Sequence, residues 1–214
     1  RLLALRLVLS SASCPPEVIR RWRRPGRRLI GTYGPPEATV TTTWTELEPG
    51  RPPSLGVPLP TYSVVVLDVE DPRSALPRGA IGEIGIAGVG LARGYVNRDD
   101  LAQAAFVADS LDVPGNPSQR IFRTGDLGRL DEDGYLFIVD RKKDIIIRGG
   151  ENISCLEVEE AIYAHDDVAE CSVFGLPDDR YGEIVGAVYL TRDGASLSEA
   201  ELAAARGHLV EGAV

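Results

Sequence analysis

At the stretch Asp140–Ser154, DRKKDIIIRGGENIS, the pattern of predicted secondary structure changes. The stretch contains both lysines of the chain, Lys142 and Lys143, whereas the other 21 of the 23 basic residues are arginines. An apolar triplet and a Gly-Gly pair follow the lysines, and this pattern predicts a short strand that ends in a tight turn. We interpret the stretch as the junction between two separately folded parts of the chain.

The sequence before the junction predicts a strand-rich part with few helices. We expect a buried strand at 5–10, further strands at 29–32, 62–69, 81–88 and 135–139, short strands around 122 and 127, and helices at 15–24 and 97–106. The stretch EPGRPPSLGVPLP at 48–60 is rich in proline and glycine, which predicts an extended surface loop.

The sequence after the junction alternates strands and helices. Strands are predicted at 144–148, 168–174 and 184–191, and helices at 156–164 and 198–209. The second helix would begin with a capping box formed by Ser198 and Glu201. This alternation is typical of a small α/β lobe, so the fold class is mixed α/β (α+β). The domains expected are 1–140, a hinge at 141–143, and a small mobile lobe at 144–214.

Composition limits the classes of protein to consider. The hydrophobic share of 43% and charged share of 26% are those of an ordinary globular protein, and no apolar run is long enough to span a membrane. The net charge of −9 disfavours nucleic acid as a partner. Three scattered cysteines without a CxxC pair argue against a disulfide framework or zinc site and favour a reducing cytoplasm. Because the chain contains no methionine, we expect an internal segment of a longer protein or a processed product.

Two basic stretches leave alternatives open. RLLALRLVLSS at the start resembles a short signal peptide, but it fits a strand better because it lacks a clear cleavage site. RRWRRPGRR at 20–28 carries six arginines and is either a patch for an anionic partner or the solvated face of a short helix. Because the patch is isolated in an acidic chain, the solvated face is favoured.

Four blocks with chemical character follow one another along the chain. They are TYGPPEATVTTTW at 32–44, GEIGIAGVGLARGY at 82–95, FRTGDLGRL at 122–130, and the junction itself. In this order and spacing they resemble the carboxyl-terminal half of the adenylate-forming superfamily, which includes acyl-CoA synthetases, adenylation domains of nonribosomal peptide synthetases, and luciferases. The resemblance runs from about Leu5 to Leu209. It implies that 1–140 is the last part of the large nucleotide- and acyl-binding domain.

The first block combines an aromatic ring with a carboxylate. Tyr33 precedes a Gly-Pro turn that would fix its ring in a cleft, where an adenine can stack on it. Glu37 offers the hard oxygen that Mg²⁺ prefers alongside phosphates. The resemblance implies these same roles and counts Glu37 among the catalytic residues. The family motif has threonine where Pro36 stands here, so one hydroxyl expected near the phosphates is missing.

The third block and the junction supply further groups for the nucleotide. Asp126 follows a glycine turn, where a carboxylate either caps its own loop or accepts hydrogen bonds from two vicinal hydroxyls such as those of a ribose. The family uses this aspartate in that way, and the resemblance assigns Arg141 to the ribose and phosphate side. It also assigns Ile138 to the nucleotide and places Ser11 and Ala12 against the adenine, although SSASCP is an irregular match there.

The remaining assignments also follow from the resemblance. Lys143 would be the hinge residue about which the small lobe rotates between two half-reactions, and a hinge needs no particular charge. Gly149 and Gly150 would let the backbone approach a pantetheine arm closely, and an ordinary β-turn is compatible with that role. GVGLARGY would be structural, because it lacks the Lys-Ser/Thr of a phosphate loop. The expected walls of the acyl pocket are Leu7, Leu9, Thr32, Val40 and Thr41.

The function expected is that of a segment of an ATP-dependent ligase, which forms an acyl-AMP from a small carboxylic acid with Mg²⁺. The acyl group would pass to a thiol of a carrier-protein phosphopantetheine or of CoA. The first two blocks resemble peptide synthetase adenylation domains, whereas the junction, LEVEEAI and PDDRYGE resemble acyl-CoA synthetases; the adenylation domain is favoured. A different alternative is a degenerate module that serves as a docking scaffold. The family's phosphate loop and carboxyl-terminal lysine are not in this sequence, so the resemblance implies a segment truncated at both ends. We therefore expect the 214-residue chain alone to be nearly inactive.

Overall fold

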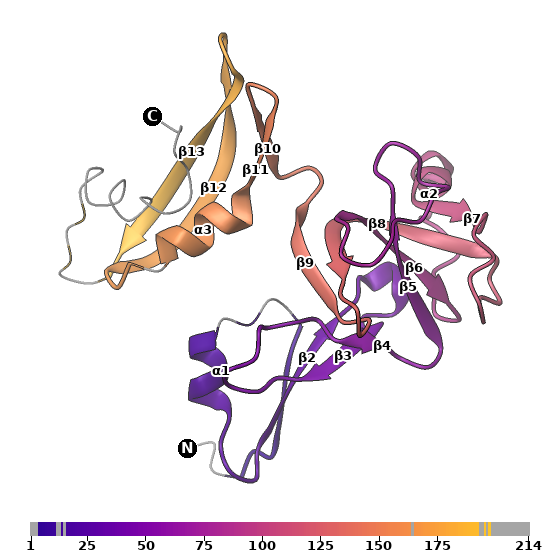
Figure 1. Ribbon diagram of the computed structural model, residues 1–214, viewed down its shortest axis with the longest axis horizontal. Coiled ribbons are helices and arrows are strands. Elements are labelled where there is room, and N and C mark those ends of the chain that lie inside the picture. The colour runs from indigo at the N-terminus through magenta and orange to yellow at the C-terminus, as the bar shows by residue number, and fades with distance from the viewer. Residues whose placement is uncertain are drawn as a thin grey trace. The chain divides into compact units, whose positions relative to one another are not determined.

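The structure is a computed structural model that describes residues 4–11, 14, 16–163, 165–192, 195 and 197. The chain divides into two compact units, Arg1–Ile138 and Val139–Val214, whose elements are labelled in Figure 1. The boundary lies just before the segment 141–143, whose role as a hinge stays a prediction.

The first unit begins with a four-stranded sheet in the order β1-β2-β3-β4. Its strands are β1 (Leu7–Ser10), β2 (Arg28–Tyr33), β3 (Thr43–Glu46) and β4 (Val57–Pro58). β1 and β2 are parallel and are joined through helix α1 (Pro16–Trp22), whereas the other pairs are antiparallel. Ile19 of α1 is buried in one cluster with Cys14, Leu29 and Leu47, so the helix covers one face of the sheet.

The second sheet of this unit is antiparallel and contains the best buried strand. It consists of β5 (Tyr62–Leu67), β6 (Gly82–Gly88), β8 (Arg120–Leu130) and β7 (Phe106–Ala108), with β9 (Leu136–Arg141) paired to β8. Helix α2 (Asp99–Ala105) leads directly into β7. All seven residues of β6 are buried, and Ile84 and Ile86 lie in the core with Phe122 and Leu136.

Gly56 joins the two sheets. The amide of Leu55 donates to the carbonyl of Leu136 at 2.7 Å, and the amide of Leu136 donates to the carbonyl of Gly56 at 2.8 Å. Gly56 has φ +84°, and a Cβ at this position would lie 1.9 Å from the carbonyl oxygen of Trp44. Only glycine therefore fits at this crossing of β3 and β9.

The second unit is a small α/β structure. Its sheet has the order β11-β10-β13-β12, formed by β10 (Ile145–Arg148), β11 (Glu151–Ser154), β12 (Val168–Asp178) and β13 (Gly182–Thr191). Helix α3 (Cys155–Tyr163) begins where the Ser154 hydroxyl accepts the amide of Glu157 at 3.1 Å, an N-cap contact. Val158 and Ile162 on its apolar face lie in one buried cluster with Ile146 of β10, so the helix packs on the sheet.

Several expectations are corrected by the structure. The strand predicted as buried at 5–10 is an edge strand, because β2 is the only strand among the described residues that pairs with β1. Leu7 is 50% exposed and Leu9 is 63% exposed. The stretch 48–60 is more than a surface loop, since it contains β4 and the buried Leu55. The two short strands expected around 122 and 127 are one strand, β8. Strands β3, β7 and β11 were not predicted, and the helix expected at 198–209 lies outside the described residues.

The arginine-rich stretch is also more than a solvated helix face. Arg23 and Arg28 both lie 3.0 Å from the carboxylate of Glu46 on β3. The guanidinium of Arg27, a residue only 9% exposed, donates to the carbonyl of Leu5 at 3.0 Å. These arginines therefore connect the segment after α1 to its own sheet.

Candidate functional site

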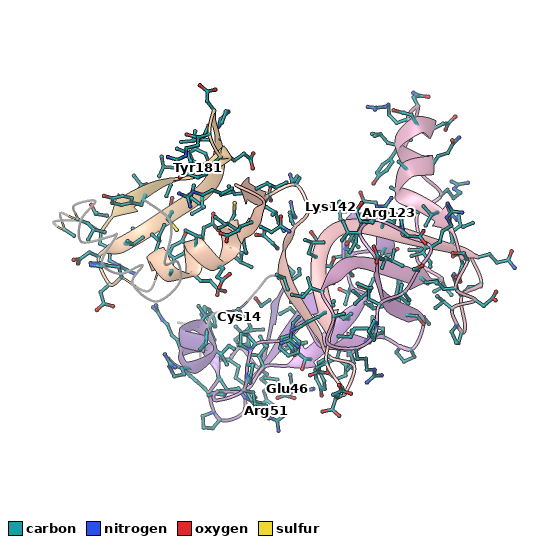
Figure 2. All side chains as sticks on the ribbon, turned by 45° about the horizontal axis from the view of Figure 1, so that its top comes forward. Cys14, Glu46, Arg51, Arg123, Lys142 and Tyr181 are labelled. Atoms are coloured by element: carbon teal, nitrogen blue, oxygen red, sulfur yellow. The ribbon has the colours of Figure 1, made fainter. Side chains whose placement is uncertain are left out.

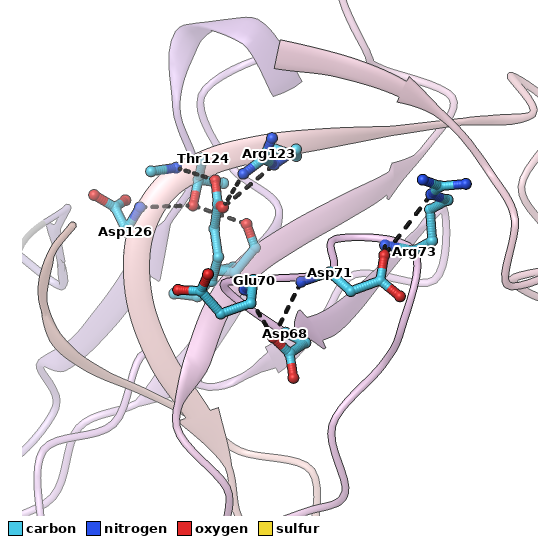
Figure 3. A network of polar contacts seen from close by, with 10 residues as sticks. Asp68, Glu70, Asp71, Arg73, Arg123, Thr124 and Asp126 are labelled. Carbon is cyan, nitrogen blue, oxygen red and sulfur yellow. Dashed lines mark hydrogen bonds and ion pairs between the residues drawn. The ribbon is translucent and has the colours of Figure 1, made fainter. Parts of the chain in front are cut away.

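The RTGD block forms a wide bulge in β8. Gly85 of β6 pairs with Arg123, and Glu83 pairs with Leu127, so the single residue Ile84 faces three residues of β8. Gly125 at the tip has φ +74°, a conformation that favours glycine. Such bulges re-aim side chains next to functional sites. Here the bulge carries Asp126 (Figure 3).

Side chains from the bulge and from β6 hold this backbone in place. Thr124 Oγ1 donates to the carbonyl of Ile84 at 2.9 Å and accepts the amide of Asp126 at 3.0 Å. The Glu83 carboxylate accepts the amide of Gly125 at 3.2 Å and pairs with the Arg123 guanidinium at 2.6 Å. The bulge is thus fixed by groups that strand pairing alone would not supply.

Tyr33 and Asp126 come together although 93 residues separate them. The Tyr33 hydroxyl donates to Asp126 Oδ2 at 2.6 Å. Tyr33 ends β2 and is only 8% exposed, with its ring in the core beside Ile84. The structure therefore unites the two blocks predicted to hold adenine and ribose, and it leaves little ring surface of Tyr33 open in this chain.

Glu37 lies on a short 3₁₀ helix, η1 (Pro36–Ala38), that follows β2. Its Oε1 accepts the hydroxyl of Tyr95 at 2.7 Å, and its carbonyl accepts the amide of Ala92 at 2.7 Å. Partial burial and this carboxylate raise the pKa of Tyr95 to about 12, so the phenol stays protonated and donates. The block GVGLARGY, predicted to be structural, therefore holds the segment that carries Glu37 through two hydrogen bonds, one from Tyr95 and one from Ala92.

The turn after η1 is strained at two residues. Thr39 has φ +59° and Val40 has φ +68°, and a β-branched residue such as valine rarely adopts a positive φ. The Thr39 hydroxyl donates to the carbonyl of Gly90 at 2.7 Å, and the buried Thr42 hydroxyl donates to the carbonyl of Tyr33 at 2.9 Å. Contacts on both sides thus impose the strained turn, as is common where a site is pre-organised.

The residues predicted to line the acyl pocket differ widely in exposure. Leu7, Leu9 and Val40 are exposed, and Thr41 is half-buried. Thr32 is buried, and its hydroxyl donates to the carbonyl of Ser10 at 3.4 Å. Their role in a pocket stays a prediction.

Of the residues predicted at the nucleotide, Ser11 lies next to the end of β1. Ser11 is exposed directly after this strand, and Ala12 lies outside the described residues. Ile138 lines a cavity of about 30 Å³ together with Cys14 and Gly31 of the same unit.

A larger cavity of about 430 Å³ lies elsewhere in the first unit. Its rim includes Glu46 and Arg51, labelled in Figure 2, together with Asp133 and Phe137. None of the predicted site residues lines it. We therefore assign it no part in the candidate site.

The predicted residues of the second unit lie on its exposed turns. Arg141 and Lys143 are exposed in the turn closed by the amide of Asp144, which donates to the carbonyl of Arg141 at 2.9 Å. Gly149 (φ +59°) and Gly150 (φ +90°) form a two-residue hairpin turn between β10 and β11. Two successive positive φ angles favour a glycine pair. The contact of this pair with a pantetheine arm stays a prediction.

The environment of each cysteine disfavours its ionised, nucleophilic form. Burial raises the pKa of the Cys155 thiol to about 11, and carboxylates led by Asp140 add to this shift. Burial also raises the pKa of Cys14 and of Cys171. A thiol is a nucleophile in its ionised form, so we assign none of the three a role in the candidate site.

Glu37 is the candidate for holding a metal ion. Within the described part of the chain, no three His, Cys, Asp or Glu side chains gather into a metal-binding group. Magnesium bound to a nucleotide needs only one or two protein carboxylates, because phosphates and water supply its other ligands. Glu37 fits this requirement, since the described contact with Tyr95 engages Oε1 and leaves Oε2 for another partner.

No helix among the described residues is long and apolar enough to cross a membrane.

Sequence reasoning missed the residues that support the site. Glu83 is only 3% exposed, and Tyr95 and Thr42 make the contacts described above. A signal existed for Glu83, because a lone carboxylate stands inside the apolar run IGEIGIAG. Tyr95 and Thr42 carry no such signal, since their partners are distant in the sequence.

Comparison with known proteins agrees with the geometry. Residues 1–96 match the family model of AMP-binding enzymes, and residues 157–211 match the model of the AMP-binding enzyme C-terminal domain. The chain is 39% identical over 191 residues to a probable non-canonical nonribosomal peptide synthetase, CymA, of Salinispora arenicola. It is 38% identical over 197 residues to a long-chain-fatty-acid–CoA ligase of Bacillus subtilis. These alignments cover 88% and 90% of the chain but only 2% and 32% of the two proteins.

A solved structure extends the agreement to three dimensions. ATP-bound MatB from Rhodopseudomonas palustris superposes with a TM-score of 0.80 at 32% identity, over 97% of this chain and 39% of that one. The chain belongs to the adenylate-forming superfamily of AMP-binding enzymes and corresponds to the carboxyl-terminal part of these proteins.

Proposed function

We propose that this chain is a segment of an ATP-dependent ligase that activates a small carboxylic acid as its acyl-AMP and passes the acyl group to a thiol. The observation that carries the proposal is the 2.6 Å hydrogen bond between Tyr33 and Asp126. It joins the two blocks expected to face adenine and ribose, and it orients the Asp126 carboxylate on a braced bulge. Membership of the AMP-binding family supports the same reading.

The proposed chemistry has two steps. A carboxylate oxygen of the acid attacks the α-phosphorus of ATP, and the bond to the bridging oxygen breaks as pyrophosphate leaves. A thiolate then attacks the acyl carbonyl carbon, and AMP leaves. Holding the reactants in line supplies much of the acceleration in such transfers.

Each described residue has a limited task in this scheme. Asp126 accepts the ribose hydroxyls, and Arg141 reaches the ribose and phosphate side of the nucleotide. Glu37 would hold Mg²⁺ through its second oxygen, and the ion supplies charge neutralisation at the phosphates. Tyr95 keeps Glu37 oriented through its 2.7 Å hydrogen bond. Rotation of the second unit about Lys143 would switch the protein from the adenylation step to the thiol-transfer step.

Two acceptors are compatible with the sequence blocks. We favour a carrier protein bearing phosphopantetheine, because TYGPPEATVTTTW and GVGLARGY resemble peptide synthetase adenylation domains. CoA is the second candidate, favoured by RKKDIIIRGGENIS and by the similarity to the Bacillus subtilis ligase.

The free cysteines Cys14, Cys155 and Cys171 support a reducing, cytoplasmic location.

A docking scaffold without catalysis is the alternative of another class. Pro36, which replaces the threonine hydroxyl of the family motif, favours it. The braced Asp126 and the oriented Glu37 count against it, because loss of catalysis would remove the need for either arrangement.

The proposal is tested by ATP–pyrophosphate exchange on the full-length protein with panels of amino, aryl and fatty acids. We expect exchange with one class of acid, followed by transfer to CoA or to a carrier protein in a second assay. A folded full-length protein that shows no exchange with any acid would favour the scaffold.

A further inference from the structure

We propose that Glu83 is a positioning residue for Asp126. Its buried carboxylate holds the bulge of β8 in the conformation that presents Asp126 to the ribose of a nucleotide. The inference rests on the proposed function, because it assigns Asp126 to the ribose hydroxyls.

The bulge needs an internal support because it departs from the strand ladder. Between the pairs Gly85–Arg123 and Glu83–Leu127, one residue of β6 faces three residues of β8. The amides of Gly125 and Asp126 therefore bond to side-chain oxygens, at 3.2 Å and 3.0 Å. The first of these oxygens is Oε1 of Glu83 and the second is Oγ1 of Thr124.

A carboxylate is the group that this position requires. Glu83 Oε2 accepts Nε of Arg123 at 3.2 Å and Nη2 at 2.6 Å, while Oε1 accepts the amide of Gly125. All three partners are donors, and an ionised carboxylate is purely an acceptor. An amide in its place would turn an NH₂ group toward one of these donors, and it would leave the half-buried Arg123 without its counter-charge.

The position of Glu83 links this support directly to the site. The Gly125 amide that it holds belongs to the residue immediately before Asp126. On its other side, Asp126 meets the Tyr33 hydroxyl at 2.6 Å. Movement of the tip would shift the Asp126 carboxylate away from Tyr33 and from any ligand that it binds.

A purely structural ion pair makes a different prediction. If Glu83 only stabilises the sheet, its loss lowers the stability of the protein and reduces the affinity for all nucleotides by the same factor. If it positions Asp126, its loss erodes the preference for nucleotides that carry ribose hydroxyls. The ratio of affinities for ATP and for 2′-deoxy- or 3′-deoxy-ATP therefore separates the two roles.

The experiment uses the full-length protein with Glu83→Gln, Glu83→Asp and Asp126→Ala. Glu83→Asp keeps the charge opposite Arg123 but withdraws the carboxylate from Gly125 by one methylene group. Glu70→Gln is the matched control, because Glu70 is an exposed carboxylate in the turn after β5. Binding of ATP and of each deoxy-ATP is measured by calorimetry, with thermal unfolding recorded in parallel.

We expect wild type and Glu70→Gln to prefer ATP over the deoxy nucleotides. Both Glu83 variants should reduce this preference about tenfold, the value of one charge-assisted hydrogen bond. Combined with Asp126→Ala, Glu83→Gln should cause no further loss of preference, because the two changes act on the same contact.

Two results would overturn the inference while leaving the proposed function intact. One is an unchanged preference in both Glu83 variants. The other is a Glu83→Gln effect on preference that persists in the Asp126→Ala background. A wild-type protein that binds ATP and the deoxy nucleotides equally would instead contradict the role of Asp126 in the proposed function, and the inference would fall with it.

Discussion

Replacing Tyr33 with phenylalanine tests the link between β2 and the bulge of β8. The change removes one hydroxyl and leaves the ring in the core cluster that contains Ile84 and Phe122. Tyr33 is 8% exposed, so the ring packing is expected to survive. The variant therefore removes the 2.6 Å hydrogen bond to Asp126 and keeps the ring.

The expected cost follows from the environment of the acceptor. A hydrogen bond to a charged group contributes about 1.5–3 kcal/mol. Asp126 is half-buried, and water replaces part of what it loses, so we expect the lower end of this range, about 1.5 kcal/mol. For a unit of the size of Arg1–Ile138, that loss corresponds to a fall of about 4–8 °C in its unfolding temperature.

The assay can follow the first unit alone. The two tryptophans of the chain, Trp22 and Trp44, both lie within Arg1–Ile138. Urea unfolding followed by tryptophan fluorescence therefore reports the free energy of unfolding of this unit. A double-mutant cycle with Asp126→Ala isolates the pairwise contribution. A coupling energy near zero would refute the link between the two segments.

Three further predictions concern other parts of the chain. Gly56→Ala should prevent stable folding of the first unit, since the added Cβ would overlap the Trp44 carbonyl, and its fluorescence-detected unfolding should shift or disappear. In the second unit, Ile146→Ala should cost about 2–5 kcal/mol by circular dichroism, whereas the neighbouring Ile147→Ala, 55% exposed, should cost about 0.5 kcal/mol or less. Because the pKa of Tyr95 rises from its ordinary value of 10 to about 12, its stabilising effect is complete below pH 10 and is lost as the pH rises toward 12. Ultraviolet titration should show a late-ionising tyrosine component that Tyr95→Phe reduces; an unchanged titration would contradict the contact with Glu37.

Local signals predicted most of the fold. A β-branched run predicted β5, and the Gly-Gly pair predicted the turn between β10 and β11. The strand β11 was missed because ENIS has no strong strand propensity and pairs only through the hairpin that precedes it. β4 was missed because its two residues pair with β3 across a proline-rich stretch, where tertiary contact overrides local preference.

The candidate site shows a similar limit. Tyr33, Glu37 and Asp126 were predicted from residue chemistry and family resemblance. Their supports were not, because Tyr95 lies 58 residues from Glu37, and Glu83 lies 42 residues from the Gly125 amide. Pairings at such separations depend on sheet register, which a single sequence does not specify for an irregular strand such as β8.

The most direct test of the account is carboxylate-dependent ATP–pyrophosphate exchange by the full-length protein, compared between wild type and Asp126→Ala. Asp133→Ala, which removes a carboxylate from the turn between β8 and β9, serves as the matched control. The account predicts exchange by wild type and by the control, and a fall of tenfold or more in kcat/KM for ATP in Asp126→Ala, as expected for loss of charge-assisted hydrogen bonds. Equal exchange by Asp126→Ala and wild type would contradict the assignment of the RTGD bulge to the nucleotide.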